Sequence, residues 1–182
     1  MNARQMIKAL AVGVAFIATV SAVIGDAQAQ EKHKFSYKLP ASAGKYPQQY
    51  SIDVGDVPGH AARIYEIERA FPPGTLAFEG VSVVRERIVG YSDYVNTNGP
   101  AWAYGVYYLE DGNKVYARAS GASQTTFNPD GTKNSISTGV ANLTGGTGKF
   151  KGIRGSARFN VRFDPAVGRI DAVYDGEYWM ED

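Results

Sequence analysis

The chain has 182 residues, no cysteine, and almost equal numbers of basic and acidic side chains, 19 Lys and Arg against 18 Asp and Glu. The lack of cysteine excludes disulfides, thiol catalysis and thiolate metal sites. Nucleic-acid binding needs a basic excess that this chain does not have, so we expect no nucleic-acid partner.

Residues 1–29 have the organisation of a secretory signal peptide. Arg4 and Lys8 form a basic start, an apolar run covers residues 9–25, and Ala27-Gln28-Ala29 offers a small-x-small cleavage pattern. An uncleaved anchor is the alternative, because about 17 apolar residues can span a bilayer. The small residues in the run favour cleavage, which predicts a secreted or periplasmic protein with no stable membrane insertion.

The remaining 153 residues carry 17 basic and 17 acidic side chains, since residues 1–29 contain Arg4, Lys8 and Asp26. This length suits one domain with a sizeable core, and the 12 tyrosines of the chain favour strands. Residues 30–60 are rich in proline, which predicts an extended lead-in with one short strand over residues 50–54.

Strand-like runs separated by turn signals fill residues 61–182, the expected barrel domain. They cover residues 62–71, 80–94, 101–110, 113–126, 137–143, 156–164 and 169–180. The predicted fold class is all-β: a single antiparallel, mostly up-and-down barrel of about eight strands.

Asp111-Gly112 is typical of a two-residue type I′ hairpin turn. Such a turn pairs Tyr108 with Val115, and it places large side chains over small ones on one face. That face would line a cavity, so we name Trp102, Tyr104 and Tyr108 as ligand-binding candidates. A solid core without a cavity is the alternative.

The last hairpin has a second, independent indication of register. If Phe163 faces Ile170, the opposite charges of Arg162 and Asp171 also face each other, and the alternating apolar residues share the inner face.

Residues 62–70 and 83–89 suggest an interior polar group. Setting Glu66 opposite Arg87 places Tyr65, Arg69 and Glu86 on the other face, with Arg69 and Glu86 as diagonal neighbours. An inward Glu86 would have a raised pKa and could orient a ligand or move a proton. The alternative leaves Arg69 and Glu86 at the barrel rim, in water.

Asp93, between two tyrosines near a strand end, is the second catalytic candidate, with turn capping as its alternative role. The only histidines are His33 and His60, and neither position suits a metal site. We therefore expect no metal and no cofactor.

Gly145-Gly146-Thr147-Gly148, followed by Phe150 and Arg154-Gly155, resembles the GGTGxFxxxRG segment of dirigent proteins and the allene oxide cyclase superfamily. The resemblance covers about eleven residues and implies an exported eight-stranded barrel with an apolar cavity, frequently a trimer. Those relatives act on phenoxy radicals or an epoxide fatty acid. Their catalytic acidic residues have no match here, so the resemblance implies no activity.

Three functions stay open. The leading hypothesis is an exported barrel that binds a small apolar or aromatic molecule in its interior. The alternatives are a dirigent- or cyclase-like enzyme on the same barrel, using Glu86 or Asp93, and a noncatalytic envelope or interaction protein.

Overall fold

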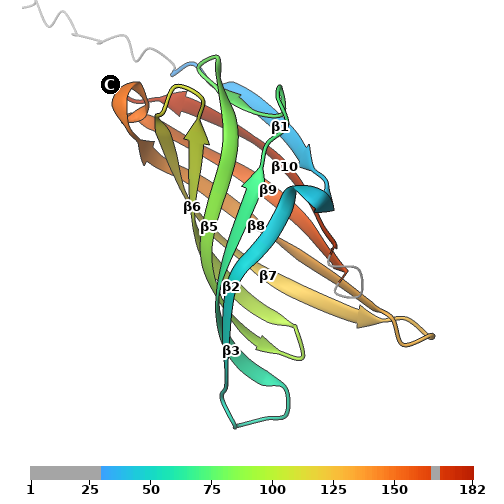
Figure 1. Cartoon of the computed structure of the whole chain (residues 1–182). Coiled ribbons are helices and arrows are strands. Elements are labelled where there is room, and N and C mark those ends of the chain that lie inside the picture. The colour runs from blue at the N-terminus through green and yellow to red at the C-terminus, as the bar shows by residue number, and fades with distance from the viewer. Residues whose placement is uncertain (1–29, 165–168) are drawn as a thin grey trace, which may run out of the picture.

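The computed structural model describes residues 30–164 and 169–182, so the predicted signal peptide lies outside the described residues. Most of the described chain belongs to one antiparallel sheet of ten strands (Figure 1). Consecutive strands are mostly neighbours, which is an up-and-down topology. The all-β, antiparallel, barrel-like fold predicted from the sequence is confirmed.

The strands and two short 3-10 helices follow one another as β1 (His33–Leu39), η1 (Ala41–Ala43), β2 (Gly44–Asp53), β3 (His60–Ala70), β4 (Ala77–Phe78), β5 (Val81–Val95), β6 (Gly99–Leu109), β7 (Lys114–Phe127), β8 (Lys133–Gly146), η2 (Gly148–Phe150), β9 (Ile153–Asp164) and β10 (Arg169–Met180). No helix among these residues is both long and apolar enough to cross a bilayer.

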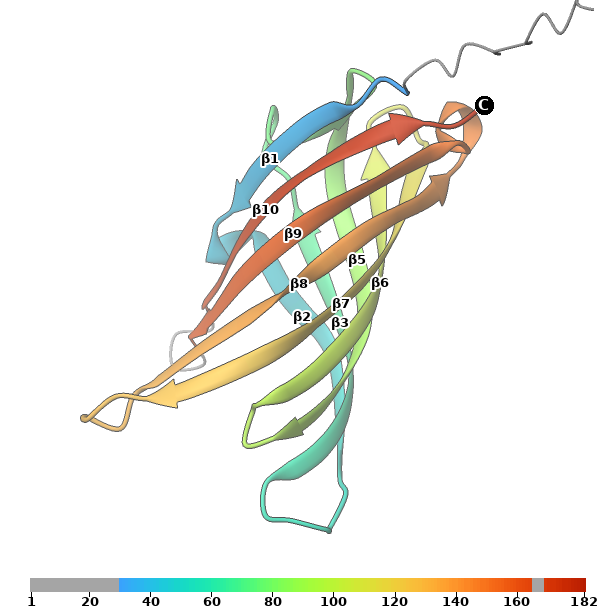
Figure 2. The same ribbon diagram turned by 180° about the vertical axis from the view of Figure 1, so that it is seen from behind.

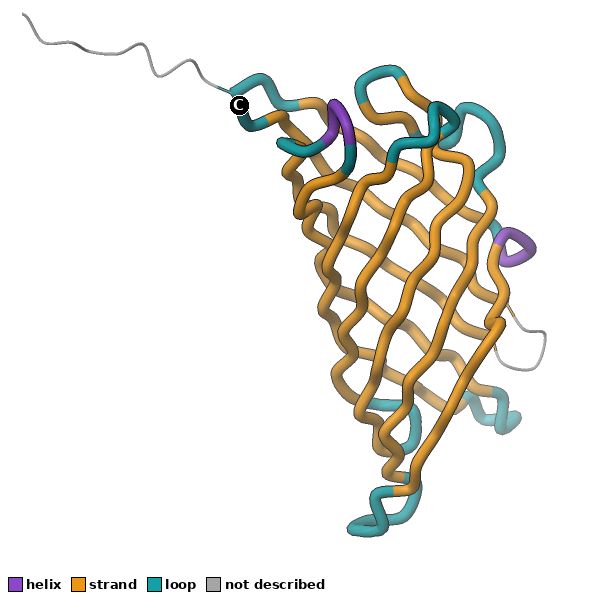
Figure 3. The backbone as a smooth tube through the Cα atoms, turned by 60° about the vertical axis from the view of Figure 1, so that its left-hand side comes forward, coloured by secondary structure: helices purple, strands orange, loops and turns teal. Residues whose placement is uncertain are grey.

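The sheet curls without closing through hydrogen bonds. Its order is β1-β10-β9-β8-β7-β6-β5-β3-β2, with β4 paired to β5 only. Figure 2 shows β1 beside β10 at one edge, and Figure 3 shows the strands of the front and back walls crossing each other. The sheet therefore has two edges, β1 and β2, with a seam between them.

Aromatic side chains close part of this seam where backbone hydrogen bonds do not. Phe78 packs edge-on against Phe35 of β1 and Tyr178 of β10, with ring centroids 6.0 and 5.3 Å apart. The Tyr178 hydroxyl also accepts a hydrogen bond from the Glu79 backbone N–H at 3.0 Å. Side-chain packing thus joins β10 and β1 to the segment around β4.

Residues 30–60 contribute two sheet strands, where the sequence analysis expected an extended lead-in with one short strand. In β1, Phe35, Tyr37 and Leu39 alternate toward the interior, a pattern typical of a strand. Pro40 follows the end of β1, and Pro47 lies in the register shift between Lys45 and Gln48 of the edge strand β2. Proline is tolerated at strand ends and in irregular edge strands, so it did not prevent strand formation.

The β6–β7 hairpin has a different register from the predicted one. Tyr108 pairs with Lys114 and Tyr107 with Val115, a shift of one residue. The Leu109 N–H donates to the Asn113 carbonyl and Gly112 has φ +83°, so Glu110, Asp111 and Gly112 form a three-residue loop with a left-handed glycine. A shift of one residue exchanges the faces of the strand.

The last hairpin has the predicted register. Phe163 pairs with Ile170, Arg162 with Asp171 and Arg158 with Asp175. Ala157, Val161 and Ala172 are buried on the inner face, as the alternation predicted.

One end of the sheet, which holds the β6–β7 hairpin and η2, is filled by apolar side chains; we call it the plugged end. Phe78, Phe150 and Ile153 are completely buried there. A Cβ on Gly146 would lie 2.9 Å from the Phe150 Cβ and 2.3 Å from the Lys114 carbonyl oxygen, so only glycine permits this approach. The glycine at position 146 therefore allows Phe150 to pack in the core.

Candidate functional site

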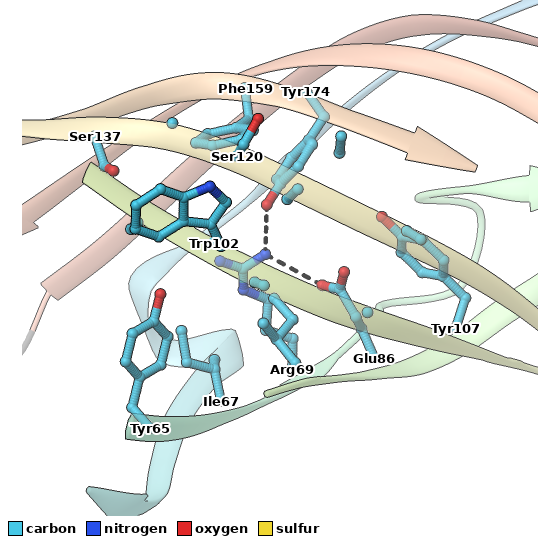
Figure 4. Close-up of a pocket in the computed structure, with 18 residues that line it drawn as sticks. Tyr65, Ile67, Arg69, Glu86, Trp102, Tyr107, Ser120, Ser137, Phe159 and Tyr174 are labelled. Atoms are coloured by element: carbon cyan, nitrogen blue, oxygen red, sulfur yellow. Dashed lines mark hydrogen bonds and ion pairs between the residues drawn. The ribbon is translucent and has the colours of Figure 1, made fainter. Parts of the chain in front are cut away.

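A cavity of about 80 Å³ lies in the sheet interior (Figure 4). Part of its wall consists of small residues from β6, β7 and β8, namely Ala101, Ala103, Gly105, Ala117, Ala119, Gly121 and Ala141. Larger side chains surround it, namely Tyr65, Ile67, Arg69, Glu86, Ile88, Tyr107, Phe159 and Tyr174, and Trp102, Ser120 and Ser137 complete the lining. Small residues on three adjacent strands thus leave the free space that the larger side chains surround.

An ion pair between Arg69 and Glu86 lies at this cavity. Arg69 of β3 pairs directly with Glu86 of β5, and its Nη1 donates to Glu86 Oε2 at 3.1 Å. Only 4% of each side chain is exposed. The sequence predicted that the two residues are diagonal neighbours, with a location at the barrel rim as the alternative. The β3–β5 register differs from the predicted one by two residues, and both side chains point inward.

Tyrosines surround the ion pair. Arg69 Nη1 also donates to the Tyr174 hydroxyl at 2.9 Å, so Arg69 lies between Glu86 and Tyr174 in Figure 4. The hydroxyls of Tyr107 and Tyr37 are 3.1 Å apart. Burial raises the pKa of Glu86, while Arg69 and a hydrogen bond with Tyr107 act in the opposite direction. The network can hold a polar ligand group or a proton.

Hydroxyl groups line the interior toward the other end of the sheet, which holds the β2–β3, β5–β6 and β7–β8 connections; we call it the open end. Ser92, Ser123 and Ser137 are buried there. Ser123 and Ser137 form side-chain hydrogen bonds with Tyr94, whereas Ser92 Oγ has no hydrogen-bond partner within the described residues. Burial raises the pKa of Tyr94, and these hydrogen bonds lower it. Tyr94 therefore stays a neutral donor at neutral pH.

A second cavity, of about 230 Å³, lies at the open end, and we call it the mouth cavity. Its lining residues are Gly59, Ala61, Arg63, Tyr94, Asn96, Thr97, Phe127 and Lys133. Tyr94 thus lines the mouth cavity, while its partner Ser137 lines the inner cavity. The two spaces lie on either side of one hydroxyl cluster.

The ligand-binding candidates divide between the two faces of the sheet. Tyr65 points inward over Gly90, where a Cβ would come within 2.6 Å of its ring. Trp102 borders the inner cavity, but its ring stacks on Tyr91, is 38% exposed and belongs to the outer face. Tyr104 is 57% exposed and Tyr108 packs under Arg85, so the placement of Trp102, Tyr104 and Tyr108 as inward residues was wrong.

Asp93 lies on the outer face and bonds to a histidine. His60 Nε2 and Asp93 Oδ1 are 2.6 Å apart, and His60 Nδ1 lies 2.5 Å from Asp56 Oδ1. The hydrogen bond to Asp93 and then that to Asp56 raise the pKa of His60. The two carboxylates contact opposite ring nitrogens, and across residues 30–164 and 169–182 no group of ligands could hold a metal ion.

An apolar row crosses the outer face of four strands. Tyr50 pairs with Ile64, Ile64 with Tyr91, and Tyr91 with Trp102, with exposed fractions that fall from 67% to 38% along the row. Tyr50, Ile64 and Tyr91 of this row border a groove of about 580 Å³, together with Ile52, Val54 and Tyr104. Exposed apolar patches of this kind mark interaction surfaces.

Sequence reasoning missed Tyr107, Tyr174 and Arg63. The predicted hairpin register, which put Tyr108 on the inner face, implies an outward Tyr107. Tyr174 belongs to the alternating apolar residues of the last hairpin, for which no partner across the interior was predicted. The alternation of Arg63, Tyr65, Ile67 and Arg69 along β3 was a usable signal, because all four share the inner face.

Arg154, the arginine of the resemblance segment, contacts the turn and the chain end. Its Nη1 donates to the Ile153 carbonyl at 2.9 Å, and its Nε lies 3.0 Å from Glu181 Oε2.

Comparisons of the chain with protein-family models, curated proteins and solved structures find no match.

Proposed function

We propose that this protein binds one small, largely apolar or aromatic molecule inside its sheet. The inner cavity carries the proposal, because a wall of alanines and glycines leaves space beside a buried Arg69–Glu86 pair. Apolar pockets with a few convergent polar groups are the usual form of a small-molecule site.

The cavity size limits the ligand. Its 80 Å³ is below the ~150 Å³ of an engineered cavity that holds benzene. A single ring therefore enters only if it extends past the Tyr94 hydroxyl cluster toward the mouth cavity, or if the seam between β1 and β2 widens.

Native mass spectrometry of the protein from its own host, followed by denaturation, tests the proposal by releasing and identifying a passenger. Ala119→Leu fills the inner cavity and should abolish the bound mass, whereas Ala122→Leu, on the exposed face of the same strand, should retain it. An empty protein that stays empty with a library of small apolar compounds would contradict the proposal.

Catalysis on the bound molecule is the second candidate, and the raised pKa of the buried Glu86 favours it. Once the passenger is known, conversion by the unchanged protein and loss of conversion in Glu86→Gln would establish this function. Asp93→Asn is the control, because Asp93 lies on the outer face and should leave conversion unchanged.

An interaction protein is the third candidate, and the exposed apolar row favours it. Sedimentation over a wide concentration range, compared between the unchanged protein and Ile64→Thr, tests whether the row associates. The trimer implied by the dirigent and allene oxide cyclase resemblance would give a threefold mass.

Export belongs to the same proposal. The signal-like residues 1–29 support it, with cleavage after Ala29. N-terminal sequencing of the protein from the host's exported fraction should begin at Gln30, and an uncleaved chain in the membrane fraction would overturn it.

A further inference from the structure

The mouth cavity carries more positive charge than the structure neutralises. Arg63, on the inner face of β3, and Lys133, at the start of β8, both line it. No residue in its lining is acidic. The open end of the sheet therefore presents two cations to the interior.

Both cations are positioned by neutral groups. Arg63 donates to the Gln49 side-chain oxygen at 2.5 Å, and its guanidinium lies 5.7 Å from the centre of the Tyr65 ring. Lys133 Nζ lies 5.6 Å from the centre of the Phe127 ring. Within the described part of the chain, neither cation forms an ion pair, whereas Arg69 deeper inside is paired with Glu86.

These positions define two ends of one binding path. The mouth end has unpaired cations and aromatic surface from Tyr94 and Phe127, and the inner end has a wall of alanines and glycines. Clefts lined by one sign of charge attract ligands of the opposite sign, and a guanidinium matches the geometry of a carboxylate.

We propose that the interior ligand is a small organic carboxylate, with its charge at Arg63 and Lys133 and its apolar body directed toward the inner cavity. This inference rests on the proposed interior binding and adds the ligand class. The Tyr94 hydroxyl cluster lies along the path and offers neutral hydrogen bonds to the part of the ligand between the two ends.

Binding of benzoate and of benzamide, which have the same ring and nearly the same size, tests the charge directly. Chemical-shift titrations of the protein at pH 7.5 and low salt should show benzoate binding at least about tenfold more tightly than benzamide, with shifts at Tyr94 and Phe127. Added sodium chloride should weaken benzoate binding only, because salt screens the charge.

Arg63→Gln and Lys133→Gln separate the two cations. Each should reduce the affinity for benzoate by about threefold to tenfold while leaving benzamide unchanged, since one charge interaction is removed. Arg118→Gln is the matched control, because Arg118 lies on the outer face beside Tyr104 and should change neither affinity. Lys133 is exposed, so its variant stays informative if Arg63→Gln does not fold.

The outcomes distinguish this inference from the proposed function. Equal binding of benzoate and benzamide, with no effect of Arg63→Gln or Lys133→Gln, would overturn the carboxylate inference and leave interior binding in place. Binding of neither compound would count against both. A neutral passenger in the native mass spectrum would overturn only the carboxylate inference.

Discussion

The Arg69–Glu86 pair takes two charges out of water, with 4% of each side chain exposed. Desolvation of such ions costs several kcal/mol each, and the pair offsets this cost only when further hydrogen bonds are made. Tyr174 and Tyr107 supply those bonds. The four side chains therefore depend on one another: removing Arg69 or Glu86 leaves a buried charge without its ion-pair partner, and removing either tyrosine leaves a charged group with one hydrogen bond fewer.

We expect Glu86→Leu to lower the free energy of unfolding by about 3–5 kcal/mol, because Arg69 would stay buried without its carboxylate. The double variant Arg69→Met/Glu86→Leu should recover most of that loss, since no charge remains inside. Urea denaturation of the three proteins measures the difference. An equal loss in the single and double variants would show that packing, not charge, dominates here.

His60 ties the β2–β3 connection to β5 through Asp56 and Asp93. Because its pKa is raised in the folded protein, its stabilisation is fully present below the ordinary histidine pKa and is lost as the pH rises through the folded value. The pKa of Asp56 is lowered, so its stabilisation is lost at acidic pH. The interactions of His60 with Asp56 and Asp93 should therefore stabilise the fold most in mildly acidic solution.

We expect His60→Asn to lower the melting temperature more at about pH 5.5 than at about pH 8.5, since the unchanged His60 loses its charge between these values. Thermal unfolding followed by circular dichroism at both pH values measures this. The same loss at both would mean that His60 contributes packing or neutral hydrogen bonds only.

At the scale of the elements, alternation predicted most strands, but it did not determine their registers. Charge pairs supported the correct register of β9 with β10, where the inner apolar residues agreed with them. Asp111-Gly112 fits both a two-residue turn and a three-residue loop, and the wrong choice reversed the faces of β6. Register therefore depends on turn geometry that a dipeptide does not specify.

Gly112 holds this loop by its backbone conformation alone. Its φ is +83°, and a Cβ would meet nothing within 4 Å. Gly112→Ala should therefore cost about 1–2 kcal/mol of unfolding free energy from the left-handed conformation. Gly112→Asn should cost less, because asparagine tolerates that region better. Denaturation of both variants measures the costs, and a larger loss in Gly112→Asn would contradict this account.

At the scale of the whole molecule, the candidate site depends on contacts that only curling creates. Arg69 and Tyr174 lie on β3 and β10, 105 positions apart in sequence, and these strands are not neighbours in the sheet. Pairwise strand patterns predicted that Glu86 could point inward. They could not show which residues would meet it across the interior, because that depends on the curvature of the complete sheet.

The free edges at the seam should be visible in hydrogen exchange. We expect backbone amides on the unpaired side of β2 to exchange faster than those of β7, which has hydrogen-bonded neighbours on both sides. Deuterium uptake by mass spectrometry measures this at peptide level. Equal protection of β2 and β7 would indicate that β2 pairs with another strand in solution.

The seam also affects how large a ligand the protein can bind in its interior. In a barrel closed by hydrogen bonds, widening the interior requires breaking backbone bonds along a whole strand. Here β1 and β2 are joined by the chain through η1 and share no strand pairing, while aromatic rings close the seam near β4. The interior of the sheet can thus widen at the seam when side chains slide past one another, while the backbone hydrogen bonds stay intact.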